Sequence, residues 1–169
     1  MSSALNRFLD RKVSSLVRSP ERAARVGRMV ARQHSGVSLE TLRHEALVEV
    51  RDGFRKSGRT ADVEQVAYEA HLVLTAASLR KPWVSVELPR GADKTTHAFM
   101  SATLAAWLAE GLSRVPGLPS ALARDAGRGM ARAAGFFKEL ADLGGSGFSL
   151  EDLRANDVGL KGVFSSVED

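Results

Sequence analysis

The amino-acid sequence predicts an all-α fold, a multi-helix bundle whose C-terminal helical hairpin is closed by a glycine-rich corner. Apolar residues recur every three or four positions through most of the 169 residues, as they do on the buried faces of amphipathic helices. Alanine, leucine, arginine and valine dominate, and only 6% of the residues are aromatic, which favours helices packed through small side chains. N-cap residues, prolines and glycines divide this pattern into separate helices.

Four helices are expected in the first half of the chain, over residues 3–17, 20–33, 39–57 and 61–80. Ser19 and Pro20 give the second helix an N-cap followed by a proline at its first position. Ser38 opens the third helix and Gly58 ends it. Thr60 is expected to open the fourth helix. Each helix carries an apolar stripe at helical spacing, so each needs a partner to cover one face.

The periodicity changes between Pro82 and Pro89, where the sequence WVSVELP alternates in character. Alternation of this kind is typical of a short edge strand or of an extended linker. No second strand is expected to pair with it, so we expect a short extended linker near residues 82–90. It separates an N-terminal basic helical region, residues 1–81, from a C-terminal helical region, residues 91–162, within one compact unit.

The second half predicts two long helices and a short one. The fifth helix begins at Asp93 or Thr95 and runs to about residue 112, and the sixth runs from about Ser120 to residue 143. Five residues of the sixth helix are expected to let a neighbouring helix approach closely: Gly127, Met130, Ala131, Ala134 and Gly135.

A glycine corner, GGSG, ends the sixth helix at residues 144–147. Gly147 suits a left-handed backbone. Ser149 is expected to cap the last short helix, with Asp152 at the capping-box position. The chain after Gly162 is expected to be loose.

Composition excludes several classes of site and protein. The chain has no cysteine, so disulfides, thiolate zinc sites and cysteine nucleophiles are excluded. No stretch near the start has the apolar core of a signal peptide, and the longest charge-free run, residues 95–109, is too short and polar to span a membrane. We therefore expect a cytoplasmic protein or one peripheral at the inner membrane face.

Charge is distributed unevenly along the chain. Residues 1–60 contain 13 lysines and arginines against 6 acidic residues, whereas residues 61–169 contain 11 against 14. A basic front half predicts a protein partner or an anionic membrane surface as its contact, with nucleic acid ranked lower. The alternative is that these arginines solvate the outer faces of helices.

The first candidate site is the pair Asp93 and His97, which share one helix face because they are four residues apart. A carboxylate beside an imidazole can orient it or raise its pKa, which suits a general base or a metal ligand. The structural alternative is that Asp93 caps the helix and His97 is partly buried.

The second candidate group is Lys138, Glu139 and Asp142. Two carboxylates three residues apart can bind a divalent cation or divide acid and base roles between them. The structural alternative is a solvated helix end. One charged group should nevertheless face inward here and needs a partner, for which Asp93 and His97 are candidates.

The third group, Ser149, Asp152 and Asn156, follows the glycine corner and is expected to have a structural or supporting role. Ser149 and Asp152 form a capping box, and Asn156 either caps the end of the helix or forms a hydrogen bond into the cluster. The remaining histidines have no metal-ligand spacing, and the chain has no phosphate-binding loop and no nucleophile elbow. Ser101, one turn after His97, is a weaker nucleophile candidate.

Taken together, D-K-x-x-H, then K-E-x-x-D, then G-x-F-S-x-x-D-L-x-A-N-x-x-G resembles the YfiM-like family of predicted bacterial lipoproteins. The opening motif is also similar to the first helix of VanZ-like membrane proteins. The matching residues are Asp93, Lys94, His97, Lys138, Glu139, Asp142, Gly147, Phe148, Ser149, Asp152, Ala155, Asn156 and Gly159. The resemblance covers roughly residues 91–162. It implies that these polar residues converge between two helices and a glycine corner, and it brings no activity with it.

Two functions remain open at this point. The first is a helical binding or scaffolding module, associated with the cell envelope or a larger assembly and able to form a homo-oligomer, with a buried polar cluster that fixes its helix packing. The second is a small hydrolase or metal-dependent enzyme, in which Asp93 orients His97 as base, Glu139 and Asp142 bind a divalent metal or act as acid and base, and Lys138 stabilises an anion. DNA binding ranks last, because no helix-turn-helix signature is present.

Overall fold

The computed structural model describes residues 17, 19–32, 36–81, 83–88, 91–142 and 147–165. Six helices lie in this part of the chain: α2 (Pro20–Ala31), α3 (Leu39–Lys56), α4 (Val63–Arg80), α5 (Ala92–Ser113), α6 (Ser120–Asp142) and α7 (Leu150–Lys161). These described residues contain no strand, so the prediction of an all-α bundle is confirmed. The helix predicted over residues 3–17 lies outside the described residues except for its last position.

Local sequence signals explain most of the helix starts. Ser19 and Ser38 cap α2 and α3, and each side-chain oxygen accepts a hydrogen bond from a backbone N–H of the first turn. The predicted opener of α4 is wrong, because Asp62, not Thr60, is its N-cap. Helix α5 begins after Gly91 and has no side-chain cap. The carboxylate of Asp93 is therefore not engaged in capping.

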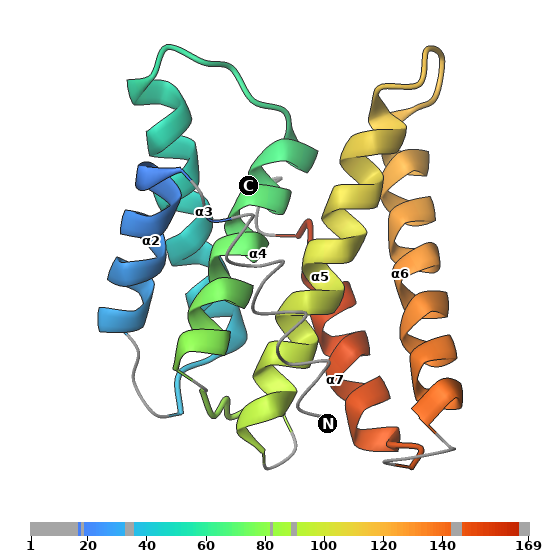
Figure 1. The fold of residues 1–169 in the computed structure, drawn as a ribbon. Helices are drawn as coiled ribbons and strands as arrows, with labels where there is room; N and C mark the ends of the chain where they lie inside the picture. Colours follow the sequence, from blue (N-terminus) through green and yellow to red (C-terminus); the bar gives the residue numbers. More distant parts are fainter. Residues whose placement is uncertain are drawn as a thin grey trace.

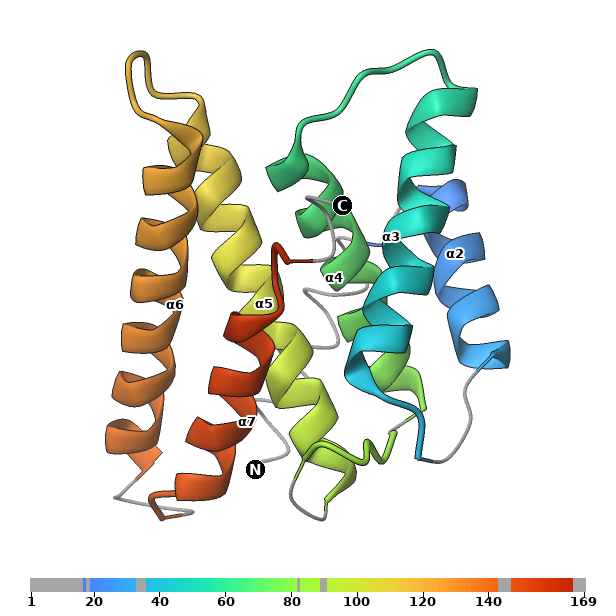
Figure 2. The same cartoon turned by 180° about the vertical axis from the view of Figure 1, so that it is seen from behind.

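Helix α5 lies at the centre of the bundle. It packs against α4 on one side and against α6 and α7 on the other, while α2 and α3 pack on α4 (Figure 1). The view from behind shows α6 at one edge of the molecule, with its outer side away from the other helices (Figure 2). Apolar residues from α2 through α7 contribute to one hydrophobic core.

Glycines bring the helices around α5 into close contact. A Cβ atom added to Gly127 of α6 would lie 2.6 Å from the carbonyl oxygen of Ala105, and one added to Gly159 of α7 would overlap the backbone of Ala98. The expected contact face of α6 is correct for Gly127 and Ala131, which are buried. It is wrong for Met130 and Ala134, which are exposed.

The linker between the two halves has no partner strand among the described residues, as expected, but it is not extended throughout, because the chain turns at Val86 and Glu87. Trp83 is buried there and packs edge to face on Phe99, and Thr95 donates a hydrogen bond of 2.9 Å to the Trp83 carbonyl. The expectation of a loose tail directly after Gly162 is wrong, because Val163 and Phe164 are buried in the core. None of the described helices combines the length and apolar character needed to cross a membrane.

Candidate functional site

The predicted polar residues converge at one end of the bundle, where α5 begins, α6 ends and α7 begins (Figure 1). The groups that meet there form what we call the polar cluster: Asp93, Lys94 and His97 of α5, Lys138, Glu139 and Asp142 of α6, and Ser149, Asp152 and Asn156 at and in α7. These three segments are adjacent because α7 packs against both α5 and α6, and Gly147, just before α7, has the left-handed backbone that the sequence predicts, with φ of 87°.

Lys94 is the central cation of the first half of the cluster. Its ammonium group donates to Asp152 Oδ1 at 2.5 Å and to Asp93 Oδ2 at 3.3 Å, and Glu151 lies 3.9 Å away. Burial opposes its charge, but the hydrogen bond and charge of Asp152 prevail and raise the pKa of Lys94. Burial also opposes ionisation of Asp152, yet Lys94 and the neighbouring cations hold the pKa of that carboxyl below its usual value.

His97 is buried beside these charges. Its side chain is 8% exposed, and Nε2 lies 3.7 Å from Asp152 Oδ2, which is beyond hydrogen-bond length. Nε2 is buried and has no hydrogen-bond partner among the described residues. Burial is the main reason that the pKa of His97 is lowered, and the positive charge of Lys138 adds to it, against the opposing effect of Asp152.

Lys138, Glu139 and Asp142 form the second half of the cluster. Glu139 is the group that faces inward, with an exposure of 1%, and it accepts a hydrogen bond of 2.8 Å from Lys138. Lys138 also donates to Asp142 at 2.9 Å. Burial opposes the charge of Lys138, but these two carboxylates raise its pKa. The predicted partners of the inward group, Asp93 and His97, are replaced by Lys138 and the backbone of Ser149.

The capping of α7 explains how the two halves are connected. Ser149 caps the helix as predicted, accepting a hydrogen bond of 3.1 Å from the backbone N–H of Asp152. In a capping box the acid at this position would accept the N–H of the cap residue. Here Glu139 of α6 accepts the Ser149 N–H at 3.0 Å. Asp152 instead turns its carboxylate toward Lys94 and His97 of α5.

Asn156 lies one turn further along α7 and joins α7 to α5. Its side-chain oxygen accepts a hydrogen bond of 2.8 Å from Ser101, so Asn156 bonds to α5 one turn beyond His97 and does not cap the helix end. Gly135 of α6 makes room for it, because an added Cβ would lie 2.9 Å from Asn156 Nδ2. Ser101 serves here as a hydrogen-bond donor.

Sequence reasoning gave Asp152 a supporting role and named Lys94 only through the family resemblance. Two signals were available in the sequence. Lys94 lies one helical turn before His97, and Asp152 lies in the first turn of the helix that follows the glycine-rich segment. Sequence reasoning also missed Arg43, a buried arginine of α3 that donates to the carbonyl oxygens of Val158 and Gly159 at 3.1 and 3.0 Å.

The other histidines do not belong to this cluster. His71 is fully buried in α4, with Nδ1 2.8 Å from the Ala67 carbonyl, and burial together with the charge of Arg43 lowers its pKa to about 3. It is therefore a neutral core residue at physiological pH. His44 is exposed on α3, and His34 lies outside the described residues.

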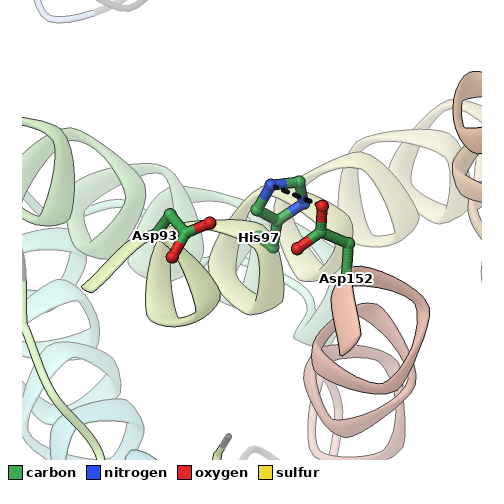
Figure 3. A group of neighbouring side chains, drawn as sticks. All are labelled: Asp93, His97 and Asp152. Carbon is green, nitrogen blue, oxygen red and sulfur yellow. Dashed lines mark ion pairs between the residues drawn. The ribbon is translucent and has the colours of Figure 1, made fainter. Parts of the chain in front are cut away.

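The polar cluster contains two neighbouring groups, one with possible metal ligands and one made of lysine–carboxylate ion pairs. Asp93, His97 and Asp152 each offer a ligand atom, and these three atoms lie within 4.8 Å of one another (Figure 3). The carboxylate beside His97 is thus that of Asp152, whereas Glu139 and Asp142 share Lys138. Much of the charge is compensated internally, which is the arrangement expected when buried polar groups fix a helix packing.

Part of the basic front half is also internally compensated. Arg22 pairs with Glu69 and Arg28 with Glu49, while Arg43 is buried. These contacts favour the interpretation in which arginines stabilise and solvate helix surfaces. An anionic partner of residues 1–60 stays a prediction.

Comparisons of the chain with protein-family models, with curated proteins and with solved structures give no match. The resemblance to the YfiM-like family therefore stays a prediction that rests on the quoted motifs.

Proposed function

We propose that the chain is a helical binding or scaffolding module that assembles through the outer face of α6. The observation that carries this proposal is an apolar stripe on that face. Six exposed residues recur there at helical spacing: Leu122, Gly129, Met130, Ala133, Phe137 and Leu140. The opposite side of α6 already packs on α5 and α7. A helix that is apolar on both sides has a second face to bury.

The size of the exposed groups makes this face unusual for a solvated surface. Met130 is 51% exposed, Phe137 66% and Leu122 54%. Charged residues such as Asp125 and Arg132 flank the stripe and pair locally or with α7. An apolar centre with a charged rim is the arrangement found in protein-protein interfaces.

The order of side chains along the stripe favours a second copy of the same chain as the occupant. If two α6 helices packed antiparallel and crossed near the level of Ala131, Leu122 of one copy would lie opposite Leu140 of the other. Gly129 would lie opposite Ala133, so the two backbones could approach closely at the crossing point. A two-fold interface needs this kind of self-complementarity, and small residues at the centre with large ones at the ends supply it.

The polar cluster supports this function indirectly. Ion pairs and hydrogen bonds of the cluster join the ends of α5, α6 and α7, so they hold α6 in a fixed orientation on the bundle. A rigid outer face loses less conformational entropy when it binds. In this role the cluster positions the binding surface and carries no chemistry of its own.

The experiment is the molar mass of the full chain by light scattering after size exclusion, from micromolar to submillimolar concentration. Wild type should approach twice the chain mass of 18.2 kDa as concentration rises. Met130→Glu places a charge on the stripe and should keep the protein at one chain mass. Val48→Glu is the matched control, since Val48 is similarly exposed on α3, and should behave as wild type.

Two outcomes would contradict the proposal. One is a wild type that keeps the mass of a single chain at every concentration. The other is co-sedimentation with anionic lipid vesicles that Met130→Glu abolishes, because the stripe would then contact a membrane and not a second copy. Circular dichroism of both variants checks that the helices are intact.

The small hydrolase is the second candidate, and one observation favours it. His97 has a lowered pKa and a buried Nε2 without a hydrogen-bond partner beside the Asp152 carboxylate, which are properties of a general base. Hydrolysis of an activated ester or phosphoester that His97→Gln abolishes, with an unchanged melting temperature, would support it. Equal rates in both proteins would exclude His97 as the base.

A further inference from the structure

The group Asp93, His97 and Asp152 has a geometry that helix capping does not explain. Asp93 and His97 lie on successive turns of α5, and Asp152 faces them from the first turn of α7, with the imidazole between the two carboxylates (Figure 3). Asp93 does not cap its helix, and the capping-box position of Asp152 is taken over by Glu139. Both carboxylates bind the ammonium group of Lys94 and neither caps a helix, so another cation can take the place of that ammonium group.

The buried nitrogen of His97 points to what that group is. Nε2 lies within the cluster, has no hydrogen-bond partner in the described part of the chain, and belongs to a side chain that is only 8% exposed. A buried polar atom without a partner is costly and rare. A metal ion bound to the imidazole lone pair would satisfy this atom.

We propose that Asp93, His97 and Asp152 bind a divalent transition-metal ion, Zn²⁺ or Mn²⁺, in exchange for the ammonium group of Lys94. One imidazole nitrogen and two carboxylates suit these ions better than Mg²⁺ or Ca²⁺, which prefer oxygen ligands alone. Three protein ligands leave coordination positions open to water. This site differs from the sequence-predicted pair Glu139 and Asp142, whose carboxylates both bind Lys138.

Lys94 is the resident cation of the site. It contacts both carboxylates, Asp152 at 2.5 Å and Asp93 at 3.3 Å, so it occupies the side from which an ion would be coordinated. Glu151 is 3.9 Å from Lys94 and 59% exposed, and it offers the ammonium group a partner when the metal enters. The site therefore exchanges one cation for another and keeps its carboxylates compensated in both states.

The test compares metal binding by the full-length wild type and Lys94→Met, using isothermal titration with Zn²⁺ and the electron paramagnetic resonance of Mn²⁺. Removing the competing cation should tighten binding of one ion by about tenfold or more. Lys138→Met is the matched control, because it removes a lysine from the neighbouring ion pairs of the same cluster. It should change the affinity much less.

Carboxylate variants in the Lys94→Met background locate the ligands. Asp93→Asn should weaken binding by at least about tenfold, and Asp93 is exposed enough for the fold to tolerate the change. Asp142→Asn should leave the affinity unchanged. A loss with Asp142→Asn and not with Asp93→Asn would overturn the proposal and place the ion at Glu139 and Asp142.

Three further results would overturn it. The first is the absence of Zn²⁺ and Mn²⁺ binding in Lys94→Met. The second is an equal gain in Lys138→Met, which would reduce the effect to general electrostatics. The third is Mg²⁺ binding as tight as Zn²⁺ binding, which would mean that His97 is not a ligand. None of these measurements depends on whether α6 mediates assembly.

Discussion

Glu139 shows what a single carboxylate does when a helix end is buried against it. The side chain has an exposure of 1% and two partners, the Lys138 ammonium and the backbone N–H of Ser149. It replaces the acid that a capping box would take from α7 itself. The start of α7 is therefore capped by its own Ser149 together with Glu139 of α6, and the carboxylate of Asp152 faces α5.

The stability of the bundle should depend on Glu139 far more than on its neighbour Asp142, although both accept a hydrogen bond from Lys138. Glu139→Gln should lower the free energy of unfolding by about 1–3 kcal/mol, because a buried hydrogen-bonded ion pair is disturbed. Asp142→Asn, at a half-exposed site, should cost less than about 1 kcal/mol. Urea unfolding of the two variants measures the difference, and equal losses would contradict the capping role.

His71 should make the protein sensitive to mild acid. The folded state holds it neutral with a pKa of about 3, whereas its ordinary value is 6.5. Below pH 6.5 the unfolded chain therefore binds more protons than the folded one, and stability falls as pH decreases, by about 1.4 kcal/mol per pH unit for each such group. His97, whose pKa is also lowered, adds in the same direction.

The measurement is the free energy of unfolding between pH 6.5 and 5, above the range in which ordinary carboxylates titrate. His71→Met should flatten the slope by about one proton, that is about 1.4 kcal/mol per pH unit. His44→Gln, which removes an exposed imidazole from α3, is the matched control. An unaltered slope in His71→Met would show that this histidine is not kept neutral by the fold.

At the scale of residues, the sequence identified the members of the polar cluster but not their partners. Asp93, His97, Glu139 and Asp152 were all visible as helix-spaced or helix-capping groups. Their pairing depends on how α7 packs against α5 and α6, and no local pattern encodes that packing. The exchange between Glu139 and Asp152 at the cap of α7 is a tertiary contact, so helix propensity alone predicts the wrong acid.

At the scale of elements, the small residues of α6 and α7 determine how closely the helices approach α5. Gly127→Ala should lower the free energy of unfolding by about 1–3 kcal/mol, because the added Cβ would lie 2.6 Å from the Ala105 carbonyl oxygen. Gly111→Ala is the control on α5 itself. No atom lies within 4 Å of the Cβ position there, so this change should stabilise the helix by up to about 1 kcal/mol. Thermal melts of the two variants should therefore shift in opposite directions.

Helix boundaries were largely predictable because they follow local chemistry. Ser19, Ser38 and Ser149 were identified as caps from sequence and all three cap their helices. At the start of α4 the N-cap is Asp62 and not the predicted Thr60, since Asp is the stronger N-cap former of two candidates that lie two positions apart. Met130 is exposed although the sequence predicts it in a helix contact. Alanines and glycines occur on all sides of α6, so the buried and exposed faces of this helix look alike in the sequence.

At the scale of the whole molecule, the sequence predicted two regions on either side of a linker, and the structure has one core that includes residues of both. Leu42→Ala, at a buried site in α3, should cost about 2–5 kcal/mol. It should also lower the single melting transition of the entire chain, because α4 packs against α5. Far-ultraviolet circular dichroism and the fluorescence of buried Trp83 should then follow the same curve.

Separate transitions for these two signals would contradict a single cooperative unit. They would indicate that α2 to α4 unfold without the C-terminal helices. Calorimetry gives an independent check, because the calorimetric and van't Hoff enthalpies agree only for a two-state transition.

The contacts of Arg43 limit the order in which parts of the protein can fold. Its guanidinium group belongs to the first half of the chain, yet its two carbonyl partners, on Val158 and Gly159, are more than a hundred residues away in sequence. During synthesis, α3 leaves the ribosome long before those carbonyl groups exist. Until then a buried position for Arg43 would leave a cation without acceptors. The N-terminal helices must therefore keep that part of their surface hydrated while translation continues, and they can close over it only when α7 arrives.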